Sequence, residues 1–259
     1  MASSITQDCP PGKLHEPCTC NYGHIYCAVK DDIDLVKVFQ TLEKNLTKEE
    51  KHFKEINLSN SFITELKENT FSDITFDEIR IQRCYNLKTI HKNAFTTTDQ
   101  VTIRLYIYDN YLLFFEAVNK FTKIISCTLS YNNITEIPSY AFKNRQDQLK
   151  TIAIYDESIK RIGENIFSNL KNLDAINLIQ TSIDFISENT FEFNEESNRT
   201  LFVFLSGNKF LNSSGLSEHS LTKFKRPTTI YFQQYKNNTN FSYFDENYLG
   251  TECYRINFF

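Results

Sequence analysis

The 259-residue sequence contains no apolar run approaching the roughly 20 residues that a membrane-spanning helix needs. It also has no tryptophan, one methionine, five prolines and six glycines. Lysine and arginine (28) do not outnumber aspartate and glutamate (32), and no long basic run is present. These absences argue against a membrane span and against nucleic acid as the main partner.

The N-terminus shows no targeting segment. MASSITQD lacks the apolar stretch of a secretory signal peptide, so none is expected within this sequence. Met1 is the sole methionine, which favours a start codon placed before a processed, mature chain.

Seven cysteines lie at positions 9, 18, 20, 27, 84, 127 and 253, and four of them crowd into CPPGKLHEPCTCNYGHIYC, residues 9–27. A zinc site would normally show two Cys-x-x-Cys pairs or a histidine pair, whereas the spacing here is Cys-x-Cys. His15 and His24 show no ligand spacing, so no metal is expected. We therefore predict two disulfides and an extracellular, oxidising compartment. Four cysteines allow three pairings, and the spacing does not choose among them.

An aliphatic pattern in TLSYNNITEIPSYAF, residues 128–142, recurs along the chain. Its template is two aliphatic residues two apart, an Asn three residues later, two further aliphatic residues, and then Phe. Eight copies begin at positions 56, 79, 105, 127, 152, 176, 203 and 230. The Asn position holds Asn132 in this stretch, Cys84 in an earlier copy and Glu157 in a later one.

This period is typical of leucine-rich repeats. We predict an α/β solenoid, a leucine-rich repeat horseshoe of about eight repeats, with a parallel β-sheet on the concave face and a disulfide-knotted N-terminal cap. The Asn side chain would satisfy backbone groups that the tight turn leaves unpaired. The predicted parts are a tail (1–8), a cysteine-rich cap (9–34), the repeats (35–245) and a C-terminal cap (246–259). Residues 31–52 read as a short helical or irregular connector, and YRINFF as the segment that covers the last repeat.

Two solitary cysteines fall on core positions of the template. Cys127 occupies an inward aliphatic position and Cys84 the Asn position. Strands about 4.8 Å apart would separate residues two repeats apart by about 10 Å, beyond the roughly 7 Å Cα limit for a disulfide. Both are therefore expected to be buried free thiols.

The order Cys…Cys-x-Cys…Cys resembles the N-terminal capping module of extracellular leucine-rich repeat proteins. That resemblance implies the pairs Cys9–Cys20 and Cys18–Cys27. More narrowly, EPCTCNYGHIYC, LVKVFQTL, SFITELKENTFSD, RIGENIFSNLKNLDAINL and LSGNKFLNSSGLSEHSLTKF resemble the arthropod secreted proteins labelled oplophorus-luciferin 2-monooxygenase non-catalytic subunit. The resemblance runs from about Cys9 to Tyr248 and implies an extracellular binding or accessory protein without catalytic machinery. High Asn, Ile, Lys and Phe content without Trp indicates an AT-rich genome, which would suit a mite or similar arthropod.

Catalytic constellations are not evident in the sequence. The five histidines are scattered, with no pair at metal-ligand spacing, and SGNK at 206–209 reads as a repeat turn rather than a phosphate loop. We expect neither an enzyme nor a cofactor.

Binding in such a fold would use the concave face, where outward residues alternate with the aliphatic ones. Exposed Tyr and Phe beside Arg are typical of interaction surfaces, although Tyr also simply suits exposed strand positions. The candidate binding residues are Arg80, Arg104, Tyr106, Tyr108, Tyr155, Phe204 and Tyr231.

Seven glycosylation sequons are present, at Asn45, Asn57, Asn133, Asn198, Asn212, Asn237 and Asn240. We expect Asn133 to face solvent beside a buried Asn132, and a glycan at Asn57 to obstruct the concave face. Replacing Asn132 by Ala should destabilise the protein by a few kcal/mol through unsatisfied buried backbone groups.

The sequence thus predicts a secreted, non-enzymatic protein that binds a protein or a glycan through its concave face. The alternative is an accessory or structural subunit that stabilises a partner or forms a homodimer. A secreted mite protein would also be expected to act as an antigen or allergen.

Overall fold

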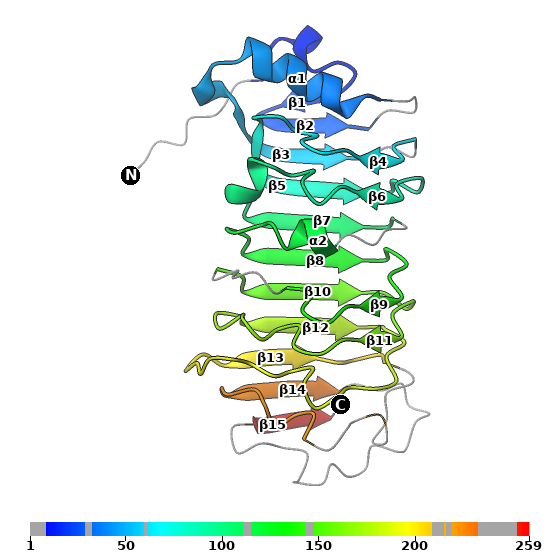
Figure 1. Cartoon of the computed structure of the whole chain (residues 1–259), viewed down its shortest axis with the longest axis vertical. Coiled ribbons are helices and arrows are strands. Elements are labelled where there is room, and N and C mark those ends of the chain that lie inside the picture. Colours follow the sequence, from blue (N-terminus) through cyan, green and yellow to red (C-terminus); the bar gives the residue numbers. More distant parts are fainter. Residues whose placement is uncertain are drawn as a thin grey trace. The chain divides into compact units, whose positions relative to one another are not determined.

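The computed structural model describes residues 9–28, 33–59, 62–110, 115–142, 148–208, 215, 219–232 and 253–258. The chain divides into two compact units, Met1–Ile124 (unit 1) and Ile125–Phe259 (unit 2). Within each unit the chain winds as a coil, and the main strand of one turn lies beside that of the next (Figure 1). Each unit therefore carries a mainly parallel sheet along one side of its coil.

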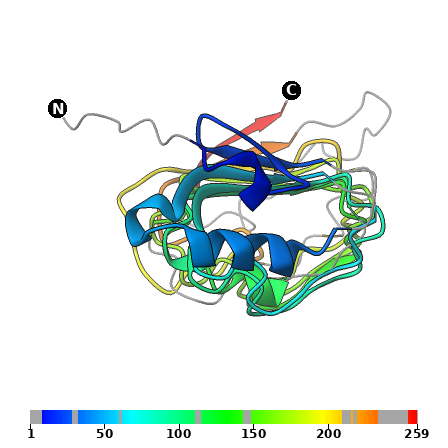
Figure 2. The ribbon, with the colours of Figure 1, turned by 90° about the horizontal axis from the view of Figure 1, so that it is seen from above.

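Unit 1 opens with the antiparallel pair β1 and β2 and continues in parallel. Its sheet strands, in order, are β1 (Thr19–Asn21), β2 (His24–Cys27), β3 (His52–Leu58), β5 (Thr75–Gln82) and β7 (Arg104–Tyr108), and a separate short pair is β4 (Glu65–Leu66) with β6 (Thr89–Ile90). The helical segments are η1 (Gly12–Leu14), α1 (Leu35–Asn45), η2 (Lys48–Glu50), η3 (Thr98–Gln100) and α2 (Phe115–Val118). Seen from above in Figure 2, α1 lies on the side of the coil opposite β2 and β3.

Unit 2 is parallel throughout its described strands. Its sheet strands, in order, are β8 (Ser126–Ser130), β10 (Thr151–Tyr155), β12 (Ala175–Ile179), β13 (Leu201–Phe204), β14 (Thr228–Phe232) and β15 (Cys253–Phe258), and a separate short pair is β9 (Glu136–Ile137) with β11 (Arg161–Ile162). β15 holds most of the predicted capping segment YRINFF and extends the sheet by one more parallel strand.

The predicted leucine-rich repeat solenoid is confirmed, because the start of every template copy falls on a main strand. In unit 1 the first template positions Ile56, Ile79 and Leu105 stand in register. In unit 2, Cys127 stands in register with Ile152, and the alignment continues to Ile230. All of these side chains are fully buried. A single strand cannot cover this apolar row alone, so stacking of repeats stabilises each unit.

Columns of phenylalanine rings fill the rest of both cores. The contacting pairs are Phe39–Phe71, Phe71–Phe95 and Phe95–Phe121 in unit 1, and Phe167–Phe191 and Phe191–Phe224 in unit 2, with ring centroids 5.0–5.8 Å apart. Phe39 comes from α1, the helix that forms in the predicted connector. The rings pack at distances typical of favourable aromatic pairs.

Two disulfides hold the N-terminal cap. They are Cys9–Cys20 and Cys18–Cys27, the pairing that the resemblance implies. Cys27 lies at the end of β2, whose Ile25 and Cys27 point into the core beneath the first repeat. The cap thereby covers the end of the apolar row that would otherwise face water.

Several described turns that follow a main strand contain a buried polar side chain that bonds to the preceding repeat, and we call these side chains the polar ladder. Asn110 accepts a hydrogen bond from the Cys84 backbone N–H of the preceding repeat (2.9 Å) and donates to the carbonyls of Ile81 (3.1 Å) and Tyr108 (2.9 Å). In unit 2, Asn208 likewise accepts from the Thr181 N–H and donates to two strand-end carbonyls. The predicted role of Asn at this position is confirmed at both sites.

One repeat departs from the template, and the prediction for Glu157 is wrong. Glu157 is exposed, and the buried residue is Asp156, which accepts from the N–H groups of Asn132 (2.9 Å) and Ile134 (3.0 Å). In the other turns that the structure describes, the residue before the ladder position, such as Tyr131 or Gln180, has a positive φ, whereas Asp156 does not. Without that left-handed residue the chain turns one residue earlier, and the carboxylate takes over the ladder.

A buried arginine links three consecutive repeats of unit 2. Arg226 is 1% exposed and donates from Nε and Nη2 to the Arg199 carbonyl and from Nη1 to the Lys171 carbonyl, all at 3.0–3.1 Å. Burial lowers the pKa of Arg226 to about 10. The cost of burying the guanidinium charge is offset by its hydrogen bonds to backbone carbonyls. The guanidinium also lies 5.8 Å from the centroid of the Phe193 ring, which favours a cation–π interaction.

Asn110→Ala should lower the free energy of unfolding by about 2–4 kcal/mol, because three buried backbone groups would lose their partner. Urea unfolding followed by circular dichroism measures the change. Asn93→Ala is the matched control, since Asn93 makes its side-chain hydrogen bond to Glu68 at an exposed position. Equal losses for the two variants would show that the ladder contributes no more than a surface amide.

Cys84 and Cys127 are free and buried, as predicted. Burial raises the pKa of the Cys127 thiol to about 12, so the reactive thiolate is scarce at pH 8. Iodoacetamide should leave both residues unmodified in the native protein at pH 8 and should alkylate both in guanidinium chloride. Peptide mass spectrometry checks each site separately, and rapid alkylation of native Cys127 would contradict its placement in the core.

Candidate functional site

The outward residues of β2, β3, β5 and β7 form a surface that we call the unit 1 strand face. Its acidic and basic side chains pair with one another within and between strands. His24 Nδ1 lies 2.8 Å from Glu55 Oε2, and Arg80 Nε lies 3.1 Å from Glu55 Oε1. Glu78 then pairs with Arg80 Nη2 and, at 2.6 Å, with Arg104 Nε. The face is therefore an ion-pair ladder within the protein.

Both candidate arginines are engaged by this ladder. The Arg80 guanidinium also lies over the Tyr106 ring, 4.3 Å from its centroid. The hydrogen bond that Arg104 donates to the Glu78 carboxylate raises the pKa of Arg104 above its ordinary value. A partner that formed an ion pair with Arg80 or Arg104 would have to displace Glu78, which is only 7% exposed.

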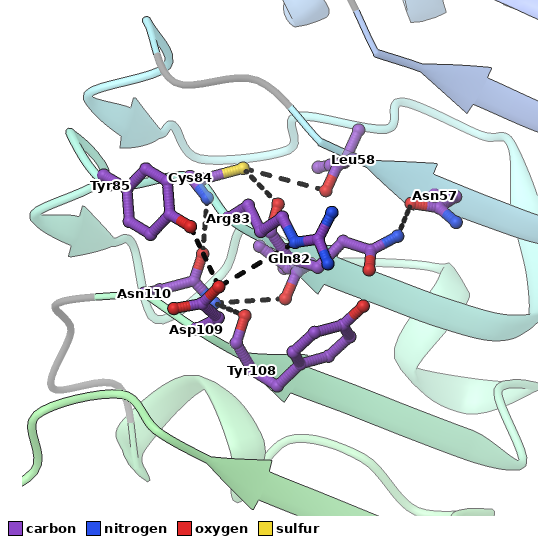
Figure 3. A network of polar contacts seen from close by, with 10 residues as sticks. Asn57, Leu58, Gln82, Arg83, Cys84, Tyr85, Tyr108, Asp109 and Asn110 are labelled. Atoms are coloured by element: carbon purple, nitrogen blue, oxygen red, sulfur yellow. Dashed lines mark hydrogen bonds and ion pairs between the residues drawn. The ribbon is translucent and has the colours of Figure 1, made fainter.

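Figure 3 shows how the end of this face is fixed. Gln82 Nε2 donates to Asn57 Oδ1 at 2.7 Å, which joins the outward ends of β3 and β5. Beyond the strand, Asp109 accepts from the Tyr85 hydroxyl at 2.9 Å and lies 3.8 Å from Arg83 Nε. These contacts connect the turns after β5 and β7, and the Asp109 carboxylate is already paired with Tyr85 and Arg83.

The outward residues of β8, β10, β12, β13 and β14 form a second surface, the unit 2 strand face. Its described members are Ser126, Thr128, Ser130, Thr151, Ala153, Tyr155, Ala175, Asn177, Ile179, Phe202, Phe204, Thr229 and Tyr231. None of these side chains carries a charge at neutral pH. The face consists of small hydroxyl and methyl groups with a few large rings.

Three of the rings stack on neighbouring strands. Phe204 and Tyr231 are register partners on β13 and β14, with centroids 4.6 Å apart and planes 6° from parallel. Phe202 lies 6.4 Å from Tyr231 and is 38% exposed. The register partners of Phe202 and Phe204 on β12 are Ala175 and Asn177. Large rings therefore stand beside short side chains, and we call this feature the aromatic stack.

Tyr155 lies at the end of β10, on the same face. Burial, followed by the nearby Tyr131 hydroxyl, raises its pKa above the ordinary value. Ala153, two residues earlier, points outward but is only 6% exposed, so larger neighbours rise above it. The half-buried Tyr155 ring therefore lies on the same face as a small, nearly buried side chain, that of Ala153.

The structure divides the predicted binding residues between the two units. Arg80, Arg104, Tyr106 and Tyr108 belong to unit 1, and Tyr155, Phe204 and Tyr231 belong to unit 2. The template places Glu55, Glu78 and Phe202 among the outward residues, but the list of candidate binding residues left them out. The available signal was that Glu55, Glu78 and Arg104 occupy the same template position in successive repeats.

Four of the seven predicted glycosylation sites lie in described parts of the chain. Asn133 and Asn198 are exposed, Asn45 ends α1, and Asn57 is half-buried in β3. Asn212, Asn237 and Asn240 lie outside the described residues, as does the side chain of Cys253.

The described ranges contain neither a cluster of metal-ligating side chains nor a helix that could span a membrane. There, no three histidine, cysteine or acidic side chains converge as metal ligands. Neither α1 nor α2 has the length and apolarity to cross a bilayer.

Aliphatic rows on parallel strands, a polar ladder at the strand ends and a disulfide-bonded cap together define a leucine-rich repeat solenoid. The family model for the BspA type leucine-rich repeat region matches in six copies, over residues 22–111 and 114–243. The chain therefore belongs to this family.

A named relative narrows the comparison. The chain is similar to the oplophorus-luciferin 2-monooxygenase non-catalytic subunit of Oplophorus gracilirostris, with 29% identity over 192 residues. The match covers 71% of this chain and 51% of that protein, so the chain spans about half the length of this relative. The relative's name describes a subunit without catalytic activity.

Glu78→Gln should lower the free energy of unfolding by about 1–3 kcal/mol, because Arg80 and Arg104 would both lose a charged acceptor. Thermal or urea unfolding measures the effect. Glu65→Gln serves as the control, because its ion pair with Lys67 (3.6 Å) is exposed on both sides and should contribute little. If Glu78→Gln has the same free energy of unfolding as the wild type, the ion-pair ladder of the unit 1 strand face does not stabilise the protein.

Proposed function

We propose that the protein is a secreted, non-enzymatic leucine-rich repeat protein that binds a partner protein through the unit 2 strand face. The observation that carries the proposal is the aromatic stack of Phe202, Phe204 and Tyr231 on a face whose described side chains are uncharged. Aromatic residues contribute disproportionately to binding energy at protein interfaces.

The mounting of these rings supports recognition. Each ring is attached to a hydrogen-bonded strand and is packed against a neighbour, so little side-chain freedom remains to be lost on binding. The small side chains of Ala175 and Asn177 beside the stack leave space for a partner's side chain. The unit 1 strand face offers less, because its charges already satisfy one another.

The two disulfides of the cap support a secreted location. Disulfides persist in oxidising compartments and are rare in the cytosol. The name of the relative, which describes a non-catalytic subunit, supports an accessory role alongside another protein. Because the match covers only 51% of that relative, the association of this chain with another protein is part of the proposal.

The double variant Phe204→Ala/Tyr231→Ala should weaken partner binding by about 2 kcal/mol or more, which is about thirtyfold. The immobilised protein is exposed to secretions of the source organism, and proteins retained by the wild type are identified and titrated. Phe185→Ala is the matched control, because this ring is 50% exposed in unit 2 but lies in the turn segment after β12.

The supporting result is one protein retained by the wild type and by Phe185→Ala but lost by the double variant. Equal retention by all three would move the site away from the aromatic stack. A glycan array and light scattering test the other readings. Glycan binding lost in the double variant would replace the protein partner, and a dimer lost in it would make the stack a self-association surface.

A further inference from the structure

The turn after β8 presents the sequon Asn133-Ile134-Thr135 in a setting suited to modification. Asn133 and Thr135 are exposed, while Ile134 between them is fully buried and anchors the turn. Asn133 has a φ of 55°, a left-handed conformation that Asn tolerates better than most residues. The turn therefore holds both recognition residues of the sequon on the surface.

The amide of Asn133 also leaves its modifiable atom available. Its Oδ1 accepts a hydrogen bond from the Ser158 hydroxyl at 2.8 Å, which fixes the orientation of the amide. Nδ2, the atom that would carry a sugar, makes no hydrogen bond to the described residues. A glycan on Nδ2 would thus extend into solvent without breaking a contact of the folded protein.

Asn57 is the contrasting case. It lies in the middle of β3, the next residue Leu58 is in the core, and its Oδ1 accepts from Gln82 Nε2 at 2.7 Å. A glycan there would project across the unit 1 strand face, where Arg80 and Glu78 are packed together. The fold leaves no comparable room at this position.

We propose that Asn133 is a site of N-linked glycosylation and that Asn57 is not. In the reaction, Asn133 Nδ2 attacks the anomeric carbon of an oligosaccharide carried on a lipid pyrophosphate. The new N–C bond forms as the sugar–phosphate C–O bond breaks, Nδ2 gives up one proton, and the lipid pyrophosphate leaves. No oxidation or reduction is involved.

The position of this site agrees with the proposed binding face. Asn133 follows β8 in the turn beyond Ser130 and Tyr131, whereas the aromatic stack lies on β13 and β14. A glycan at Asn133 would therefore border the unit 2 strand face without covering its rings. The inference rests on the secretory route proposed above and does not depend on partner binding.

The test uses the full chain secreted from insect cells, recovered from the medium with both disulfides formed. Treatment with a peptide N-glycosidase in ¹⁸O-water converts each glycosylated Asn to labelled Asp, and peptide mass spectrometry reads every sequon separately. We expect label at Asn133 and unmodified Asn at 57.

A pair of variants at Thr135 separates modification from folding. Thr135→Ala destroys the sequon and Thr135→Ser preserves it, while both keep Asn133 and its backbone conformation. The first should lose the mass of one glycan and the second should retain it, with the disulfides intact in both. Unmodified Asn133 in the secreted wild type, or label at Asn57, would overturn the proposal without bearing on partner binding.

Discussion

The structure depends on hydrogen bonds made to the backbone at the ends of the main strands. There the chain leaves the sheet inside a closely packed coil, where water cannot satisfy the exposed N–H and C=O groups. Asn110 and Asn208 each accept from the preceding repeat and donate to two strand-end carbonyls. Asp156, in a repeat that turns differently, accepts two N–H groups of the preceding repeat and one from Ser158. These side chains join each repeat to the one before it. The apolar rows supply most of the burial, but they can stack only where the turns between them are satisfied.

The parts of the fold predictable from the sequence were those governed by local periodicity. Alternation along a strand places Ile56 and Leu58 inward wherever the repeat sits, and the inward side chains that the structure describes in the later copies follow it. What could not be predicted depended on contacts between repeats. Arg226 is buried because carbonyls 27 and 55 residues earlier surround its guanidinium, and no local pattern encodes that enclosure. The arginines of the candidate site were predicted as binding residues because each was considered alone. The pairs Arg80–Glu55 and Arg104–Glu78 join residues one repeat apart, which become neighbours only through strand register. Glu78 also pairs with Arg80, two residues later on the same strand.

The two strand faces use the same outward positions in opposite ways. On unit 1 the charges are paired, so a partner that covers them must remove ion pairs from water. The Coulomb attraction gained in the drier interface rarely exceeds this desolvation cost by much. On unit 2 the described face is neutral, and covering it mainly buries rings and methyl groups at about 25 cal/mol per Å² of apolar area. The same family template therefore yields one face whose charges are paired within the protein and another whose described side chains are uncharged. The difference lies in residues that the repeat pattern leaves unconstrained.

The scarcity of glycine gives the turn ladder a second role. The residue before the ladder position has a positive φ in five repeats, yet four of these residues are Arg83, Asp109, Tyr131 and Gln180, and only Gly207 is glycine. Left-handed backbone costs a residue with a side chain about 1–2 kcal/mol. That cost is sustained only if neighbouring contacts determine the turn, and the next residue is the buried ladder side chain that does so. Among the described turns, the one without a left-handed residue before the ladder position is also the one in which Asp156 replaces the ladder residue a position early. The ladder and the strained turn therefore occur together, which explains why a solenoid of tight turns can be built with six glycines.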